Sequence, residues 1–309
     1  MWGKIMGLQS YLRGTSLALA LLGSVGRPVA GQTSVPKMIG KDLENAGRDV
    51  LAIWTSPFDA NPRDILVGLF YIGSAAAISP IDDDVDRWAV RHQNSSLFDA
   101  VEPFRKGGAL YTGGRFLPVI GALYVTGLIT KKQSLRDAVI GCGVSWGANS
   151  PMRAAVYRLI GRERPDPTRG TSPPPAAEAG DQYNFDVPNN GDWGWNSFPG
   201  GHLANIVGCT SFLGHRFHMG VAEPLLYAFA GAVAVARTAD RAHWTSDQWL
   251  GTVLGFAIGR EIAHRQLKRE AARAAAVANG SVGALTQPSH GLYVAKSKGA
   301  LKLGWQRTF

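Results

Sequence analysis

The sequence predicts an all-α protein, a bundle of helices followed by a short tail. Most of the 309 residues fall in long apolar segments with helical spacing, and strand-like alternation is weak and confined to the tail. Hydrophobic residues make up 45% of the chain and charged residues 18%, which is enough apolar material for a sizeable core. Two cysteines and no internal repeat exclude a disulfide scaffold, a tetrahedral cysteine zinc site and a solenoid.

The first predicted helices lie in the N-terminal third of the chain. Residues Leu43–Trp54 have an amphipathic pattern, whereas Asp64–Ala77 are apolar on nearly every face, which predicts a buried central helix. An acidic cluster then precedes Trp88. Acidic residues are typical of the first turn of a helix, where free N–H groups and the helix dipole attract negative charge, so the cluster predicts the start of another helix. A calcium loop would also need a glycine and a later glutamate, which are missing. The cluster consists of Asp82, Asp83, Asp84 and Asp86.

The remaining segments predict five more helices and one long loop. Small residues within the second of these helices indicate close helix packing. Proline, glycine and aspartate mark a loop from Pro165 to Pro188, which stays polar as far as Asn196. The tail after Gly280 alternates weakly, as expected for a small β-hairpin or a disordered end. The predicted helices are Gly108–Ile129, Leu135–Ile160, His202–His218, Pro224–Thr238 and Ser246–Ala275.

The N-terminus has the three parts of an export signal. Lys4 and Arg13 are positive, Ser16–Val25 is a short apolar run, and residues 29–31 are small or apolar, as at a cleavage site. We therefore predict a signal peptide over residues 1–31, one helical domain over 32–278 and a tail over 279–309. An uncleaved, membrane-tethering helix is the alternative. The predicted location is export to the periplasm or to a membrane surface.

The charge and the apolar stretches bear on possible partners. The net charge is +9, so phosphate esters, anionic lipid or nucleic acid are the expected classes. No nucleic-acid-binding motif accompanies this charge, and the export signal argues against such a partner. The longest uncharged stretch, Ile65–Ile81, only approaches the length of a membrane span. We predict a water-soluble or peripheral protein with fully buried helices, and an integral membrane protein as the second choice.

Three segments, each at a predicted helix boundary, carry groups suited to phosphate chemistry. They are residues 161–165 (Gly-Arg-Glu-Arg-Pro), 197–202 (Ser-Phe-Pro-Gly-Gly-His) and 237–247. The guanidinium groups of Arg164 and Arg237 match the geometry of phosphate oxygens. The backbone amides of Gly200 and Gly201 would lie at a helix N-terminus, where anions bind.

The same segments hold two histidines and a carboxylate. His202 would lie at the mouth of the anion site, where it can donate a proton. His243 and Asp247 are four residues apart, so the carboxylate is in reach of one imidazole nitrogen and the other stays free to attack. Together these groups predict a phosphoryl-transfer site without a metal.

In these segments the chain resembles the type 2 phosphatidic acid phosphatase and vanadium haloperoxidase superfamily, which includes bacterial non-specific acid phosphatases. That family has three motifs: lysine, six residues and Arg-Pro; Pro-Ser-Gly-His; and Ser-Arg, five residues, His, three residues, Asp. The third motif matches with its spacing intact, and the resemblance covers residues 138–259. The matching residues are Arg164, Pro165, Pro199, Gly201, His202, Arg237, His243 and Asp247.

The resemblance implies a fold, a mechanism and a substrate class. It implies a helical bundle of the family's type that hydrolyses phosphomonoesters or pyrophosphates of small molecules or lipids, with no metal and no cofactor. His243 would form a phosphohistidine, Asp247 would orient His243, and His202 would protonate the leaving oxygen. Arg164, Arg237 and the amides of residues 200–201 would hold the phosphate, and vanadate would inhibit.

The chain departs from the family at three positions. Tyr157 stands at the lysine, Gly200 at the serine of the second motif, and Ala236 at the serine of the third. Losing one oxyanion donor costs about 3–4 kcal/mol of transition-state stabilisation. Arg158 and Arg162 are candidates to replace the lysine charge, although Arg158 points about 100° away from position 157 on a helix.

These departures keep other functions under consideration. A catalytically impaired relative that binds phosphate or lipid phosphate is the main alternative, and a vanadium haloperoxidase is a weaker one. Residues 143–147 fit Gly-x-Ser-x-Gly of a serine hydrolase, but they lie inside a helical pattern instead of a strand–turn–helix. Cys142 and Cys209 are predicted either to pair after export or to stay as buried thiols. The sequence does not indicate an oligomeric state.

Overall fold

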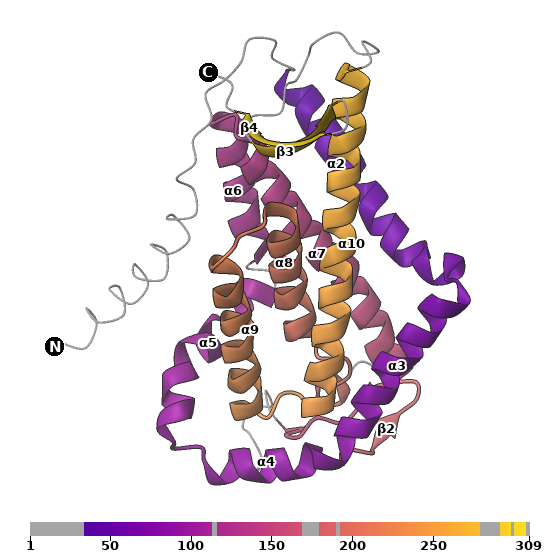
Figure 1. Cartoon of the computed structure of the whole chain (residues 1–309). Coiled ribbons are helices and arrows are strands. Elements are labelled where there is room, and N and C mark those ends of the chain that lie inside the picture. The colour runs from indigo at the N-terminus through magenta and orange to yellow at the C-terminus, as the bar shows by residue number, and fades with distance from the viewer. Residues whose placement is uncertain are drawn as a thin grey trace, which may run out of the picture.

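The computed structural model describes residues 34–112, 116–168, 179–189, 192–278, 291–297 and 300–306. It confirms the all-α architecture: helices run roughly along one axis, with one helix lying across an end of the bundle (Figure 1). The helices are α2 (Val35–Thr55), α3 (Pro62–Ile78), α4 (Asp82–Arg91), α5 (Ser96–Thr112), α6 (Phe116–Ile129), α7 (Gln133–Leu159), α8 (Gly201–Phe217), α9 (Ala222–Ala239) and α10 (Thr245–Ala278). Short 3-10 turns are η1 (Ser56–Asp59), η2 (Ser79–Ile81) and η3 (Trp193–Trp195).

Helix α8 lies at the centre of the bundle and packs against α7, α9 and α10. Its buried Phe212 meets Ile258 and Ile262 of α10, Cys142 of α7 and Ile53 of α2 in one apolar cluster. Burying large aliphatic and aromatic side chains is worth about 1.5–3 kcal/mol each. This cluster joins four helices, so it fixes their relative positions. The ends of these helices carry the site residues.

A line of glycines brings α8 and α10 into backbone contact. Gly251, Gly255 and Gly259 recur every four residues along α10, so they share one face. A Cβ atom on Gly255 would overlap the carbonyl oxygen of Ala204, and one on Gly259 would overlap that of Gly208. The two helices can therefore approach this closely only where α10 lacks side chains.

One predicted helix is two helices in the structure. The segment Gly108–Ile129, for which the sequence predicts a single helix, is divided between the end of α5 and the whole of α6. Helix α5 begins at Ser96, in a stretch where the sequence predicts no helix. Its charged residues and Pro103 obscure the apolar pattern, although they do not prevent the helix from forming.

The expectation that Asp64–Ala77 form a buried central helix is wrong. Among the residues of α3 only Ala75 is buried, and the side chain of Phe70 is 69% exposed. A helix that is apolar on every face also suits a non-aqueous surface, so composition alone does not distinguish the core from the periphery. Of the described helices, the stretch Pro62–Arg91 is long and apolar enough to cross a membrane, by length and composition only.

Several other expectations are resolved by the structure. Helix α4 begins at Asp82, as the acidic cluster predicts. Cys142 of α7 and Cys209 of α8 form a disulfide, which settles the open question of their pairing. In the described part of the tail, β3 (Gly291–Ser297) and β4 (Ala300–Gln306) pair as antiparallel strands. The predicted signal peptide, residues 1–31, lies outside the described residues.

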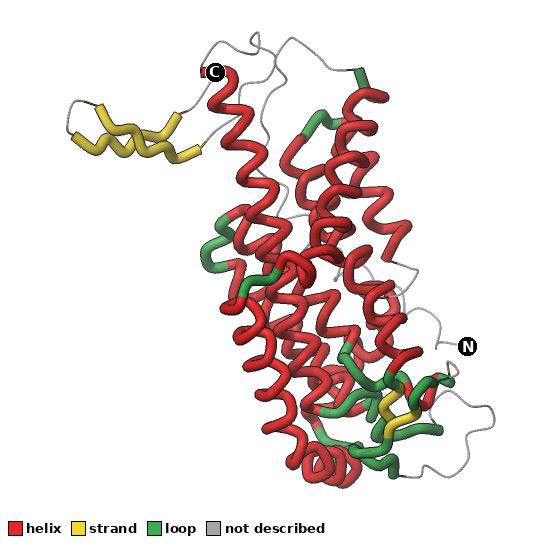
Figure 2. Tube along the Cα trace, turned by 90° about the vertical axis from the view of Figure 1, so that its right-hand side faces the viewer, coloured by secondary structure: helices red, strands yellow, loops and turns green. Residues whose placement is uncertain are grey.

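The predicted loop after α7 gathers at the end of the bundle where α4 lies (Figures 1 and 2). The loop contains β2 (Phe185–Asp186), which pairs antiparallel with β1 (Gly161–Arg162) between α7 and the loop. Helix α7 ends here, whereas α8 and α10 both begin here. The three sequence motifs are therefore brought to one end of the bundle by helix boundaries that are far apart in the chain.

The glycine contact between α8 and α10 generates a paired prediction. Gly255→Ala should lower the free energy of unfolding by about 1–3 kcal/mol, because the added methyl group overlaps backbone atoms that cannot move independently. Gly231→Ala in α9 is the matched control, since a Cβ atom at that position would meet nothing within 4 Å, and it should stabilise by about 0.5–1 kcal/mol. Thermal unfolding of both variants measures the difference. Equal shifts would contradict the close approach.

Candidate active site

Two histidines face each other at the end of the bundle. His202 lies in the first turn of α8, and His243 lies in the turn between α9 and α10. The Nδ1 atom of His202 is 3.1 Å from the Nε2 atom of His243. His243 is almost completely buried, with 3% of its surface exposed. The predicted pair of acid and nucleophile is therefore brought together, from positions 41 residues apart in the chain.

The partner of His243 differs from the expected one. The resemblance implies that Asp247 orients His243, but the Nδ1 atom of His243 donates to the backbone carbonyl of Ser197 at 2.7 Å. Asp247 instead accepts from the Ser197 hydroxyl and from Arg162. The carboxylate thus acts on His243 through Ser197, because the first turn of α10 directs the Asp247 side chain toward β1. Ser197 lies within one of the three motif-bearing segments, yet no spacing rule marks it.

Hydrogen-bond chemistry assigns the protons of this pair. A carbonyl oxygen only accepts, so Nδ1 of His243 must carry the proton that reaches Ser197. Burial lowers the pKa of His243 well below its usual value, and the charges of Arg164 and His202 lower it further, against the Ser197 hydrogen bond. His243 is therefore neutral, and its Nε2 lone pair accepts from Nδ1–H of His202. This is the protonation state that a nucleophilic histidine needs.

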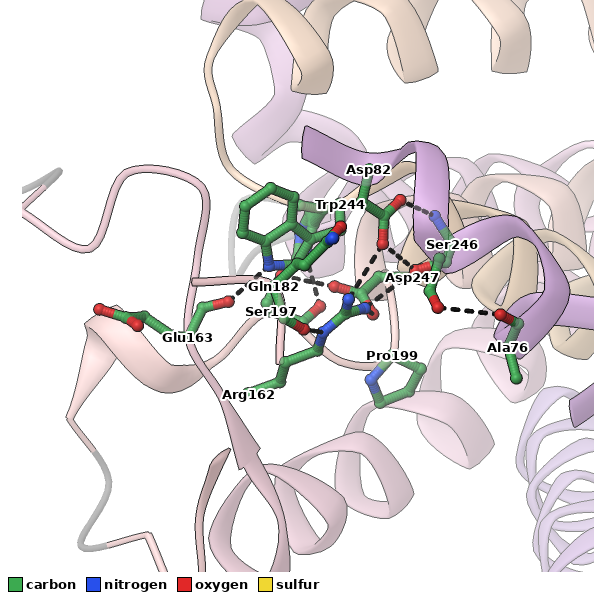
Figure 3. A network of polar contacts seen from close by, with 12 residues as sticks. Ala76, Asp82, Arg162, Glu163, Gln182, Ser197, Pro199, Trp244, Ser246 and Asp247 are labelled. Carbon is green, nitrogen blue, oxygen red and sulfur yellow. Dashed lines mark hydrogen bonds and ion pairs between the residues drawn. The ribbon is translucent and has the colours of Figure 1, made fainter. Parts of the chain in front are cut away.

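Arg162 is the buried centre of a polar network that includes Asp82, Ser246 and Asp247 (Figure 3). Its guanidinium pairs with Asp82 at 2.9 Å and with Asp247, and donates to the Ser246 hydroxyl. Asp82 also accepts from the backbone N–H of Ser246 at 2.9 Å, at the start of α10. Burial raises the pKa of Asp247, and the positive charge of Arg162 opposes that rise. The guanidinium of Arg162, a candidate substitute for the missing lysine, is thus fully engaged with groups of the protein itself.

The two motif arginines lie around His243. Arg164 donates to the carbonyl oxygen of Asn196 at 3.0 Å, and its guanidinium lies 3.6 Å from the centre of the Trp193 ring. Arg237 pairs with Asp240 at 2.8 Å. Both arginines are buried, and both lower the pKa of His243 through their charge. The structure therefore brings these two predicted phosphate ligands near His243, the predicted nucleophile.

The second motif differs from the expected anion site. The amide of Gly200, expected to bind phosphate, donates to the carbonyl oxygen of Asp247 at 2.9 Å. The Gly201 amide contacts the Tyr157 hydroxyl. A Cβ atom on Gly200 would lie 2.7 Å from the same Asp247 oxygen. The family's serine does not fit at position 200, because the loop is in backbone contact with α10.

The residues around the missing lysine take unexpected roles. Tyr157 does not replace the lysine, since its hydroxyl donates to the carbonyl oxygen of Pro199 at 3.1 Å and so anchors the loop. Arg158 is exposed on another face of α7, which excludes it as a substitute. Arg153, which none of the sequence motifs marks, lies over the Tyr157 ring at 5.6 Å from its centre. Its spacing of four residues from position 157 is the signal that could have found it.

The remaining expectations concern Ala236 and the serine hydrolase motif. Ala236 is fully buried against an apolar cluster that includes Phe98 and Val101. Ser145 is fully buried inside α7, where its hydroxyl contacts Gly208 of α8. This is small-residue helix packing and not a nucleophile elbow, which places the serine at an exposed strand–helix turn.

The lowered pKa of His243 predicts a pH dependence of stability. The unfolded chain takes up a proton on this histidine below about pH 6.5, whereas the folded protein does not. The free energy of unfolding should therefore fall as the pH drops from 7.5 to 5, by up to about 1.4 kcal/mol per pH unit from this group. His243→Asn should show a shallower fall in chemical denaturation. Identical slopes for both proteins would contradict a buried neutral imidazole.

Comparison with known proteins agrees with the motifs. Residues 155–271 match the family model of the PAP2 superfamily. A solved structure, the transmembrane PAP2-type phosphatidylglycerolphosphate phosphatase of Bacillus subtilis, is 19% identical, with a TM-score of 0.44 over 66% of this chain and 96% of that one. No curated protein matches the chain. The part of the chain that holds the site, residues 155–271, is therefore similar to the PAP2 superfamily.

Proposed function

We propose that this chain is a phosphatase that hydrolyses phosphomonoesters or pyrophosphates, foremost those of lipids, through a phosphohistidine on His243. One observation carries the proposal: a buried, neutral His243 points its free nitrogen at His202, while Arg164 and Arg237 place positive charge around it. The match of residues 155–271 to the PAP2 superfamily supports a phosphatase of this general class.

In the first proposed step, the Nε2 lone pair of His243 attacks phosphorus and the bond from phosphorus to the leaving oxygen breaks. His202 gives its proton to that oxygen. Arg164 and Arg237 neutralise the charge on the other phosphate oxygens, which is the main contribution expected in phosphoryl transfer. A phosphate cannot enter between nitrogens 3.1 Å apart, so the His202 side chain must move aside when substrate binds.

In the second step, His202 removes a proton from water, which attacks the phosphohistidine and releases phosphate. The nitrogen–phosphorus bond breaks, and its electron pair returns to Nε2 of His243. Throughout, the Ser197 carbonyl accepts from Nδ1–H and stabilises the positive charge that develops on the ring. The Ser197 hydroxyl links this loop to the Asp247 carboxylate.

A lipid substrate is supported by the surface beside the site. Helix α3 exposes a row of large apolar side chains, and it leads through η2 to Asp82 in the site network. The indole of Trp249, one turn into α10, donates to the Ser74 hydroxyl of α3 at 2.8 Å. An acyl or isoprenoid chain lying along α3 would place its phosphate at the histidines. The exposed residues are Ile65, Leu66, Val67, Leu69, Phe70 and Ile72.

The same features support the predicted location. An apolar patch of this kind marks a surface covered by lipid or protein, and α3 is the described helix suited to a membrane. The disulfide between Cys142 and Cys209 favours an oxidising compartment, in agreement with export. We therefore place the protein at a membrane on the exported side.

A binding protein without turnover is the second candidate, and one observation favours it. The amide of Gly200 is occupied by Asp247, and the lysine position is occupied by Tyr157, which bonds to Pro199. Two of the family's phosphate donors are thus absent. Phosphate binding without hydrolysis would establish this candidate.

Phosphate release by the purified full chain in detergent tests the proposal. With EDTA present, we expect turnover of p-nitrophenyl phosphate, phosphatidic acid or an isoprenoid pyrophosphate. His243→Ala should abolish it, and His202→Ala should reduce it about 100- to 10,000-fold by loss of general acid–base catalysis. Arg87→Ala is the control, because Arg87 forms exposed ion pairs in α4. Activity that survives in His243→Ala would overturn the phosphohistidine.

A further inference from the structure

A cation that the family motifs do not include lies beside the site. Arg153 is on α7, four residues before Tyr157, so the two side chains share one face of the helix. Its guanidinium lies 5.6 Å from the centre of the Tyr157 ring. Burial raises the pKa of Tyr157, and the charges of Arg153 and then Arg164 both oppose that rise. The positive charges of both guanidinium groups therefore act on the same hydroxyl.

The Arg153 guanidinium extends past the Tyr157 ring to the start of α8. A Cβ atom on Gly201 would overlap its Nη1 atom, so the guanidinium lies directly against the first residue of that helix. His202, one residue later, faces His243. Arg153 thus reaches the helix end that carries the acid histidine, from a position one turn away from the motif's lysine.

The electrostatics of this position are unfavourable without an anion. The N-terminus of a helix carries partial positive charge, which repels a guanidinium. The Nε atom of Arg153 is buried without a hydrogen-bond partner, and among the described residues no carboxylate pairs with this side chain. A partly buried cation without a carboxylate partner at a positive helix end is unfavourable, and an anion bound beside it would offset both the repulsion from the helix end and the missing hydrogen bond.

The other arginines near position 157 do not compete for this role. Arg162 is committed to Asp82 and Asp247. Arg158 is exposed on a different face of α7. Tyr157 stands where the family motif has a positively charged lysine. Among the described residues of α7 near this position, Arg153 is therefore the one that can supply the missing charge.

We propose that Arg153 is a substrate phosphate-binding residue, which supplies from one helical turn earlier the positive charge that Tyr157 cannot. The proposal rests on the proposed function, because it assigns a ligand to that same phosphate. Arg153 binds the equatorial oxygens together with Arg164 and Arg237. Tyr157 then has a structural role, because its hydroxyl donates a hydrogen bond to the carbonyl oxygen of Pro199 in the loop.

The test compares Arg153→Gln with Arg158→Gln in the full chain. Arg153→Gln should lower kcat/KM by about 100-fold, as expected for one lost oxyanion donor. Arg158→Gln, on the same helix but exposed, should leave kcat/KM unchanged. Arg153→Lys should recover part of the loss, since it restores the charge without the fork. Thermal unfolding of each variant shows whether a loss of activity is due to misfolding. If Arg153→Gln is misfolded, the activity of Arg153→Lys decides the question.

A binding measurement separates this proposal from the proposed function. Calorimetry with orthovanadate, in the His243→Ala background, does not depend on turnover. Adding Arg153→Gln should weaken vanadate binding at least 10-fold, and adding Arg158→Gln should not change it. An inactive wild type with this binding pattern would refute the phosphatase and keep Arg153 as the anion ligand. Equal vanadate binding with and without Arg153 would overturn the inference.

Discussion

The buried guanidinium of Arg162 is the contact on which the rest of the site depends. It joins Asp82 at the start of α4 and Asp247 at the start of α10, and its Nε donates to the carbonyl oxygen of Gln182 in the loop. Each carboxylate is completely buried, so removing Arg162 would leave two unpaired charges. Breaking such a buried pair costs about 3–5 kcal/mol. This one cation therefore fixes the relative positions of the two helix ends and of the loop that leads to Ser197.

The close contact of α8 and α10 explains why glycine stands at position 200, where the motif that the chain resembles has serine. Because Gly251 and Gly255 have no side chains, the loop at Gly200 lies against the backbone of Asp247. That contact occupies the Gly200 amide and leaves no room for a serine. The same approach brings His202 to His243. The packing of α8 against α10 thus takes the place of a phosphate donor at position 200, and the proposed role of Arg153 would supply positive charge nearby.

The sequence predicts the helices because their apolar spacing is a local pattern, and it locates α7, α8, α9 and α10 to within a few residues. The motifs also mark His202 and His243, which meet in the structure, but they imply a direct contact of His243 with Asp247 that does not form. It does not predict that Ser197 binds His243, since that contact depends on the path of a loop. It also assigns α3 to the core, because composition does not reveal what surrounds an apolar helix.

A crystal structure of the protein with bound orthovanadate is the most direct test of the phosphohistidine site. We predict vanadium bonded to Nε2 of His243, with Nδ1 still donating to the Ser197 carbonyl and the His202 side chain turned toward the axial oxygen. The guanidinium groups of Arg153, Arg164 and Arg237 should contact the equatorial oxygens. Vanadate bound away from His243, or held there without these arginines, would contradict this site.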